Sequence, residues 1–242
     1  MTDRRNFIDE VLQRLALRSG ASASVDRGRT GRILDYHEPH QIQADLLSAE
    51  WMRLNSLDQM MSHEARKRFE SALLWVPTIC PPSKMFRGRH FDPSDPDRNI
   101  STSFGPPPAE KCEIGRYNSA GQPVLYLSST EAGVRAEIQA PLGRTLMSHA
   151  FAIPAEVLIA DLTRNDIDPL IANAFDRAEH TDSTEYFRSN VLAHLVSSRF
   201  QGMLVPGARG TRDNQYSNLV IFSPRDLWPN WLEPASAPRE LE

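Results

Sequence analysis

The sequence predicts an α+β protein in which a mixed-sheet domain follows an N-terminal helical extension. Between residues 41 and 76, apolar side chains recur at intervals of three and four, the period of an amphipathic helix. From residue 84 onward, short apolar runs alternate with two helical patterns, which is typical of a sheet with packed helices. We therefore expect a helical region over residues 1–83, a sheet domain over 84–234 and a tail over 235–242.

The composition is that of an ordinary globular protein. The 242 residues are 40% hydrophobic and 24% charged, with a net charge of −4, which excludes collagen-like and wholly disordered chains. Without a basic excess, we expect no nucleic-acid partner. No apolar window is long enough for a membrane span or a signal core, so we expect a cytoplasmic protein without a membrane partner. Cys80 and Cys112 form no CxxC pair, and we expect two reduced, buried thiols.

The N-terminal region reads as helices joined by a linker. Apolar residues between positions 7 and 15 predict a short amphipathic helix. Residues 19–32 are rich in Gly, Ser and Arg without periodicity, which predicts a flexible linker. The helical pattern of residues 41–76 ends at Pro77.

The sheet domain is expected to contain strands over residues 85–89, 124–127, 146–153, 157–162, 203–205 and 219–222. Helices are expected over residues 131–138, with Ser129 or Thr130 as the N-cap, and over 184–200. The long proline-rich stretch 91–111 reads as irregular, and such loops in compact domains are usually functional or mobile.

Five short motifs occur in a fixed order in the first part of this domain. They are Phe86-Arg87-Gly88-Arg89, Gly105-Pro106-Pro107, Gly115-Arg116-Tyr117-Asn118-Ser119-Ala120-Gly121, Leu125-Tyr126-Leu127 and Glu137. This ordered set resembles the RES domain family, which is named for Arg, Glu and Ser. A weaker match continues through residues 159–162 and 205–207 to 218–222, so the resemblance covers about residues 84–224.

The resemblance implies a fold like that of the ADP-ribosyltransferase toxins, with NAD as the substrate. Known RES proteins degrade NAD by hydrolysis or phosphorolysis, or transfer ADP-ribose to a protein, and many are toxins held by an Xre-type antitoxin. It therefore implies a toxin-like enzyme that cleaves the nicotinamide–ribose bond. The implied partners are NAD, an antitoxin or immunity protein, and a protein acceptor of ADP-ribose.

Glu137 is the candidate catalytic carboxylate. Cleaving nicotinamide from ribose builds positive charge on the sugar, and a fixed carboxylate stabilises that charge. Glu137 lies on the helix predicted after strand 124–127, and this helix can bring its side chain back beside the end of that strand. Tyr126, within the strand, could stack on nicotinamide or present its hydroxyl to the ribose. The alternative for Glu137 is an ordinary glutamate on the surface of a helix, and the alternative for Tyr126 is a tyrosine of the core.

Arginines are the candidates for holding the pyrophosphate of NAD. The guanidinium groups of Arg87, Arg89 and Arg116 suit phosphate oxygens, and Arg116 is also counted with the catalytic residues. Arg87 and Arg89 are two positions apart and face the same side of a strand. Asn118 is a candidate NAD ligand, although a turn-forming role fits it equally well. A solvated strand face or an ion pair is the alternative for the arginines.

One departure from the family pattern concerns its serine. The family often has Ser after the Pro of its last motif, whereas here Pro206 is followed by Gly207. Ser217, next to Asn218, offers a hydroxyl from a different position, and both are candidate NAD-binding residues. The departure leaves open a non-catalytic nucleotide- or partner-binding module of the same fold.

Other signals are weak. The sequence His37-Glu38-Pro39-His40 is not HExxH, and Pro39 prevents a regular helix, so we expect no metal. Arg and His spacings of the kind found in helical ribonucleases occur at chance frequency. A ribonuclease within residues 1–83 is therefore a distant third hypothesis.

Overall fold

The structure is a computed structural model that describes residues 54, 57–80, 82–138, 141–164, 166–168, 171, 186–207, 209, 215–222 and 233–241. The helix predicted near residues 7–15, the linker 19–32 and the His37–His40 motif lie outside these residues. The chain divides into two compact units, residues 1–67 and 68–242. The predicted boundaries at residues 83 and 234 stay predictions.

The described part of the N-terminal region is helical. Helix α4 covers Leu57–Ser62 and helix α5 covers Glu64–Leu73, which confirms the end of the predicted helical stretch. Phe69 and Leu73 are buried one turn apart on α5, as the three-four spacing requires.

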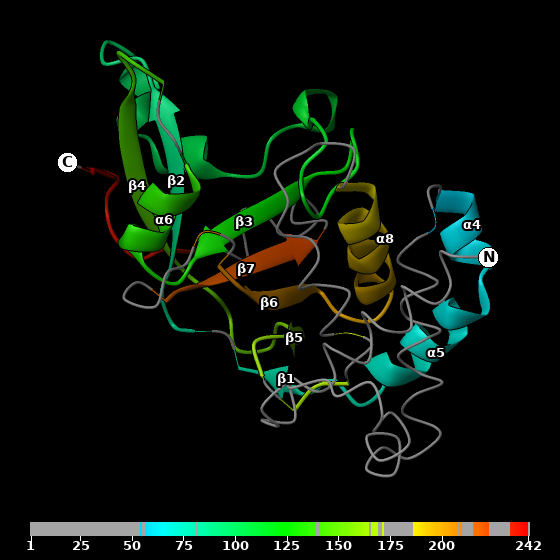
Figure 1. Cartoon of the computed structure of the whole chain (residues 1–242). Helices are drawn as coiled ribbons and strands as arrows, with labels where there is room; N and C mark the ends of the chain where they lie inside the picture. Colours follow the sequence, from blue (N-terminus) through cyan, green and yellow to red (C-terminus); the bar gives the residue numbers. More distant parts are fainter. Residues whose placement is uncertain are drawn as a thin grey trace, which may run out of the picture. The chain divides into compact units, whose positions relative to one another are not determined.

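The second unit is built on one nine-stranded sheet, shown in Figure 1. Its order is β1-β5-β6-β7-β3-β2-β4-β8, and β9 also pairs with β4. The strands are β1 Thr78–Ile79, β2 Met85–Phe91, β3 Val124–Ser128, β4 Thr145–Ala152, β5 Ile159–Asp161, β6 Gly202–Pro206, β7 Ser217–Phe222, β8 Glu233–Pro234 and β9 Arg239–Glu240. Among the described strands, β5 and β6 are the parallel neighbours and the other pairings are antiparallel. The mixed sheet confirms the predicted α+β class.

All six predicted strands are present, with ends that differ from expectation by one or two residues. The sequence did not predict β1, β8 and β9, because two-residue strands are too short to show an alternating pattern. These short strands lie on or beside the outer strands of the sheet.

Two helices pack on the sheet where the sequence predicts them. Helix α6 covers Glu131–Glu137, and the Thr130 hydroxyl caps it by accepting from the Gly133 N–H at 2.9 Å. Helix α8 covers Tyr186–Ser197. Helix α6 lies against β2, β3 and β4, and α8 lies against β6 (Figure 1).

The proline-rich stretch contains three single-turn 3₁₀ helices rather than a wholly irregular loop. They are η1 Pro96–Asn99, η2 Ser101–Phe104 and η3 Ala109–Lys111. Phe104 is fully buried, and its ring lies 5.5 Å from that of Phe91 and 5.2 Å from that of His149. This stretch is therefore anchored in the core beside β2 and β4.

Both cysteines are free thiols, as expected. Cys112 is buried, but Cys80 is exposed, so the prediction of two buried thiols is wrong for Cys80. Cys80 directly follows β1, which is an outer strand of the sheet. Among the described residues, no helix is long and apolar enough to cross a lipid bilayer.

Candidate functional site

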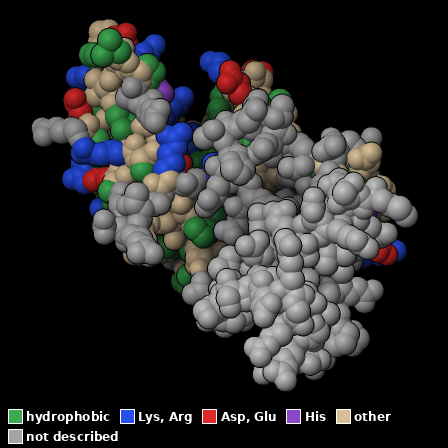
Figure 2. Space-filling model, viewed as in Figure 1, with side chains coloured by type: hydrophobic (Ala, Val, Ile, Leu, Met, Phe, Trp, Pro, Cys, Tyr) green, Lys and Arg blue, Asp and Glu red, His purple; other side chains and the backbone are tan. Residues whose placement is uncertain are grey.

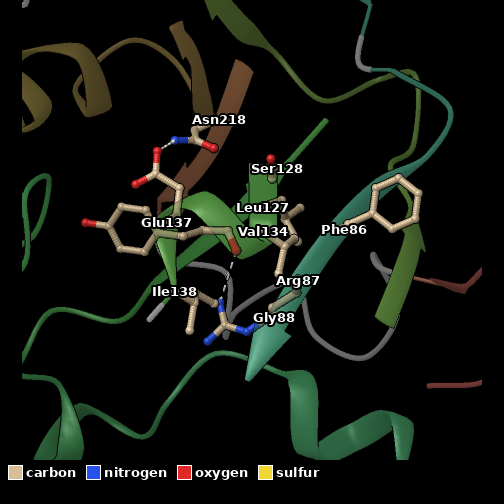
Figure 3. A pocket seen from close by; sticks show the side chains of 10 residues that line it. Phe86, Arg87, Gly88, Leu127, Ser128, Val134, Glu137, Ile138 and Asn218 are labelled. Carbon is tan, nitrogen blue, oxygen red and sulfur yellow. Dashed lines mark hydrogen bonds between the residues drawn. The ribbon is translucent and has the colours of Figure 1, made fainter. Parts of the chain in front are cut away.

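A cavity of about 340 Å³ lies where α6 packs over β2, β3 and β7 (Figure 3). This volume is near the lower end of the range of about 300–1,000 Å³ typical of small-molecule sites. Its lining brings together Arg87, Tyr126, Glu137 and Asn218, four of the residues singled out from the sequence. The remaining lining residues are Phe86, Gly88, Leu127, Ser128, Val134 and Ile138.

Glu137 reaches the cavity from the last residue of α6. Its Oε1 accepts a hydrogen bond from Asn218 Nδ2 at 2.7 Å and another from the Tyr216 hydroxyl at 2.8 Å. Figure 3 shows the Asn218 bond. Both donors are uncharged, so neither bond neutralises the carboxylate. These two hydrogen bonds hold the Glu137 carboxylate in the cavity wall.

Asn218 owes its position to the middle of the sheet. In β7 it is paired with Ser128 of β3 on one side and with Val205 of β6 on the other. Because side chains alternate along a strand, Asn218 faces α6 and the neighbouring Ser217 does not. Ser217 accordingly does not line the cavity, and its backbone N–H donates to Ser129 Oγ at 3.0 Å.

Tyr216 is the residue at this site that the sequence reasoning missed. It is buried, at 6% exposure, and its hydroxyl accepts from the Arg209 N–H at 3.2 Å while donating to Glu137. Burial, together with the hydrogen bond to Glu137, raises the pKa of Tyr216 to about 12. The hydroxyl therefore keeps its proton at neutral pH. The signal that could have found it is Gly207, which stands where the family has serine.

Arg87, which is half-buried, brings a cation to the cavity. Its Nη1 donates to the Tyr126 carbonyl oxygen at 3.3 Å, and its buried Nε has no hydrogen-bond partner in the described part of the chain. Burial, and then the nearby charge of Arg89, lower the pKa of Arg87 to about 10. The guanidinium is still protonated at neutral pH. A cation with a buried, unsatisfied donor is favourable only when an anion binds beside it.

Tyr126 lines the cavity, and its hydroxyl is held by hydrogen bonds to a neighbouring turn. The hydroxyl donates to Asn118 Oδ1 at 2.9 Å and accepts from the Tyr117 N–H at 2.9 Å. Burial raises the pKa of Tyr126. Since both hydrogen bonds go to the turn at residues 115–118, a hydroxyl contact with ribose does not fit this geometry. The stacking alternative for Tyr126 is compatible with it.

Asn118 belongs to that turn and does not line the cavity. It is buried, and its Nδ2 donates to the carbonyl oxygens of Glu113 at 2.8 Å and Ser119 at 3.1 Å. Asn190 of α8, which the sequence did not single out, donates to the Gly115 carbonyl oxygen at 2.8 Å. Asn118 and Asn190 together fix the turn that carries Arg116.

The two remaining arginines lie outside the cavity lining. Arg89 is exposed, and its Nη1 donates to the Ser103 carbonyl oxygen in η2. Arg116 lies half-buried in the turn fixed by Asn118. On the face shown in Figure 2, Lys and Arg side chains gather over β2, β4 and α6, which suits an anionic ligand.

Metal binding is not indicated by any cluster among the described residues, where no three His, Cys, Asp or Glu side chains are placed to share an ion. The absence of a metal stays a prediction.

A known family model covers most of the residues that line the cavity. The RES domain family model matches residues 88–228, more than half of the chain. The chain belongs to the RES domain family. A comparison with curated protein sequences gave no significant match.

A solved structure agrees with this RES assignment at the level of the fold. A chain from the crystal structure of the M. tuberculosis MbcT–MbcA toxin–antitoxin complex is similar, with a TM-score of 0.53 and 16% sequence identity. The similarity covers 72% of this chain and 91% of that chain. It confirms the predicted fold class.

Proposed function

We propose that this RES domain protein is a toxin-like enzyme that cleaves the bond between nicotinamide and ribose in NAD. The observation that carries the proposal is the cavity itself, whose wall contains the held carboxylate of Glu137 and the guanidinium of Arg87. NAD offers a matching pair of features: a ribose that becomes positive on cleavage and a negatively charged pyrophosphate.

Glu137 acts on the ribose. When the bond from ribose C1′ to the nicotinamide nitrogen breaks, the electron pair leaves with nicotinamide, which becomes neutral, and the sugar becomes cation-like. The Glu137 carboxylate, held by Asn218 and Tyr216, stabilises that charge. An acceptor oxygen from water, phosphate or a protein side chain then bonds to C1′ and loses its proton.

Arg87 holds a phosphate of NAD. Its Nε has no hydrogen-bond partner in the described part of the chain, and a phosphate oxygen bound beside the guanidinium would complete its hydrogen bonding. The Tyr126 ring packs against the nicotinamide half of the substrate. The other predicted NAD ligands, Arg89, Arg116, Asn118 and Ser217, do not line the cavity, so any contact of theirs is with parts of the dinucleotide beyond it.

Control by an antitoxin completes the proposal. The family resemblance implies one, and the similar solved chain comes from a toxin–antitoxin complex. We propose that the protein acts in the cytoplasm by depleting NAD or by ADP-ribosylating a protein, and that an antitoxin or immunity protein restrains it.

The test is nicotinamide release from NAD by the purified full chain, followed by chromatography. The reaction is run in buffer, with added phosphate and with cell lysate. Release in buffer indicates a glycohydrolase, release only with phosphate a phosphorylase, and release only with lysate a transferase. No release under any condition contradicts the proposal. Stoichiometric NAD binding without release would then favour the non-catalytic module.

Matched glutamine variants connect the activity to the cavity. Glu137→Gln should abolish release. Glu131→Gln changes the first residue of the same helix, outside the cavity lining, and should retain it. Glu131 pairs with the exposed Arg239, a kind of contact worth about 1 kcal/mol or less.

A further inference from the structure

The ring of Tyr216 occupies a slot between two glycines. A Cβ added to Gly133 of α6 would lie 2.6 Å from Tyr216 Cδ2, and one added to Gly207 would lie 2.6 Å from Tyr216 Cζ. Carbon atoms pack at about 3.5–4.0 Å, so any side chain at either position would overlap the ring. The Gly207 N–H also donates to the Tyr216 carbonyl oxygen at 2.8 Å. The Tyr216 ring therefore fits only because residues 133 and 207 are both glycine.

In this position of the ring, the Tyr216 hydroxyl donates a hydrogen bond to Glu137. A backbone N–H is always a donor, so the bond from Arg209 uses a lone pair of the hydroxyl oxygen and leaves its proton available. That proton goes to Glu137 Oε1 at 2.8 Å. Tyr216 does not line the cavity, so it acts through Glu137 rather than on a ligand.

Serine at position 207 and tyrosine at position 216 exclude each other in this geometry. The Cβ of a serine at position 207 would overlap the Tyr216 ring, because the three nearest atoms to a Cβ there all belong to that ring. With glycine at position 207, the ring fits and its hydroxyl donates to the Glu137 carboxylate.

We propose that Tyr216 is a positioning residue for Glu137, and that glycine at positions 133 and 207 leaves the space that lets its hydroxyl reach the carboxylate. The inference rests on the proposed role of Glu137 in cleaving NAD. The competing explanation is that the ring merely fills space, in which case the hydroxyl contributes nothing to Glu137.

A double-mutant cycle tests the contact without requiring turnover. Tyr216→Phe, Glu137→Gln and their combination are made in the full chain, and denaturation midpoints in urea are compared. If the hydroxyl and carboxylate interact, the double variant should lose less than the sum of the single variants. The control is Thr163→Val, which removes another hydroxyl that donates to a carboxylate, that of Asp161 at 2.6 Å, outside the cavity lining. Its effect should add to that of Glu137→Gln.

Kinetics test the functional consequence. Tyr216→Phe keeps the ring in its slot and should lower kcat for nicotinamide release by about ten- to a hundredfold, the equivalent of one lost hydrogen bond to a charged group. KM for NAD should stay within about twofold, because the ring does not touch the cavity. Thr163→Val should leave kcat and KM unchanged.

The outcomes separate this inference from the proposed function. Additive stability effects of Tyr216→Phe and Glu137→Gln would overturn the positioning role, and so would an unchanged kcat in an active enzyme. A coupled cycle in a protein that releases no nicotinamide would support the Tyr216–Glu137 contact while contradicting the NAD-cleaving function.

Discussion

Asn218 Nδ2 lies 2.7 Å from Glu137 Oε1, which ties the middle of the sheet to the last residue of α6. The contact joins residues far apart in the sequence, and Tyr216, which directly precedes β7, donates a second hydrogen bond to the same oxygen at 2.8 Å. Four predictions follow from the geometry around this contact and the neighbouring core.

Replacing Asn218 by Asp should destabilise the protein through charge repulsion. The change removes the donor to Glu137 and sets a second carboxylate against it, and we expect the free energy of unfolding at pH 7 to fall by about 2 kcal/mol. Urea denaturation at pH 7 measures the loss. Asn218→Ala, which removes the donor without adding charge, is the control and should lose less; an equal loss in the two variants would contradict the prediction.

Replacing Arg87 by Met should weaken NAD binding without weakening the fold. Losing a charge-assisted hydrogen bond costs about 1.5–3 kcal/mol, so Kd for NAD should rise about ten- to a hundredfold. The free energy of unfolding should hold or rise, because an apolar side chain replaces a cation whose buried Nε is unpartnered. Calorimetric titration with NAD in the Glu137→Gln background, with exposed Arg135→Met on α6 as the control, measures the first effect. Unchanged affinity would remove Arg87 from the proposed site.

Replacing Gly207 by Ala should destabilise the protein because of Tyr216. The added Cβ would overlap the ring, and overpacking of this kind costs about 1–3 kcal/mol. In a Tyr216→Ala background, the same Gly207→Ala change should cost almost nothing. Guanidinium denaturation of the two pairs of proteins makes the comparison. If the penalty persists without the tyrosine ring, its cause lies in the backbone at position 207.

His149 should make the protein sensitive to mild acid. Its ring is buried in β4 between the rings of Phe104 and Phe151, and neither ring nitrogen has a hydrogen-bond partner in the described part of the chain. Burial lowers the pKa of His149 below 6.5. The unfolded chain therefore takes up a proton first, and stability should fall as the pH drops from 6.5 towards the lowered pKa.

The variant that tests this is His149→Leu, compared with the unmodified protein by thermal denaturation between pH 5 and pH 8. We expect its Tm to change less over this range. His194→Leu, at an exposed position on α8, is the matched control and should retain the original pH dependence. A parallel fall of Tm in the unmodified protein and in His149→Leu would exclude His149 as the cause.

Much of the site could be predicted from the sequence, because the strands and the helix around it have recognisable local sequence patterns. Strand β3 shows an apolar run, and Thr130 was one of two N-caps predicted for a helix over residues 131–138, which the structure has over Glu131–Glu137. The RES motifs then pointed to Arg87, Tyr126 and Glu137 together. The sequence alone therefore determined the mixed-sheet class, most of its strands and the family.

The tertiary structure decided which of these residues meet. Ser217 and Asn218 are adjacent, and only strand alternation in the folded sheet turns Asn218, rather than Ser217, towards Glu137. The role of Tyr216 depends on space left by Gly133 and Gly207, which come from separate segments, so Gly207 became a meaningful signal only once the fold placed it beside the ring. Local chemistry sets the propensity of each segment to form a strand or helix, whereas close packing between distant segments sets which hydroxyl reaches the carboxylate.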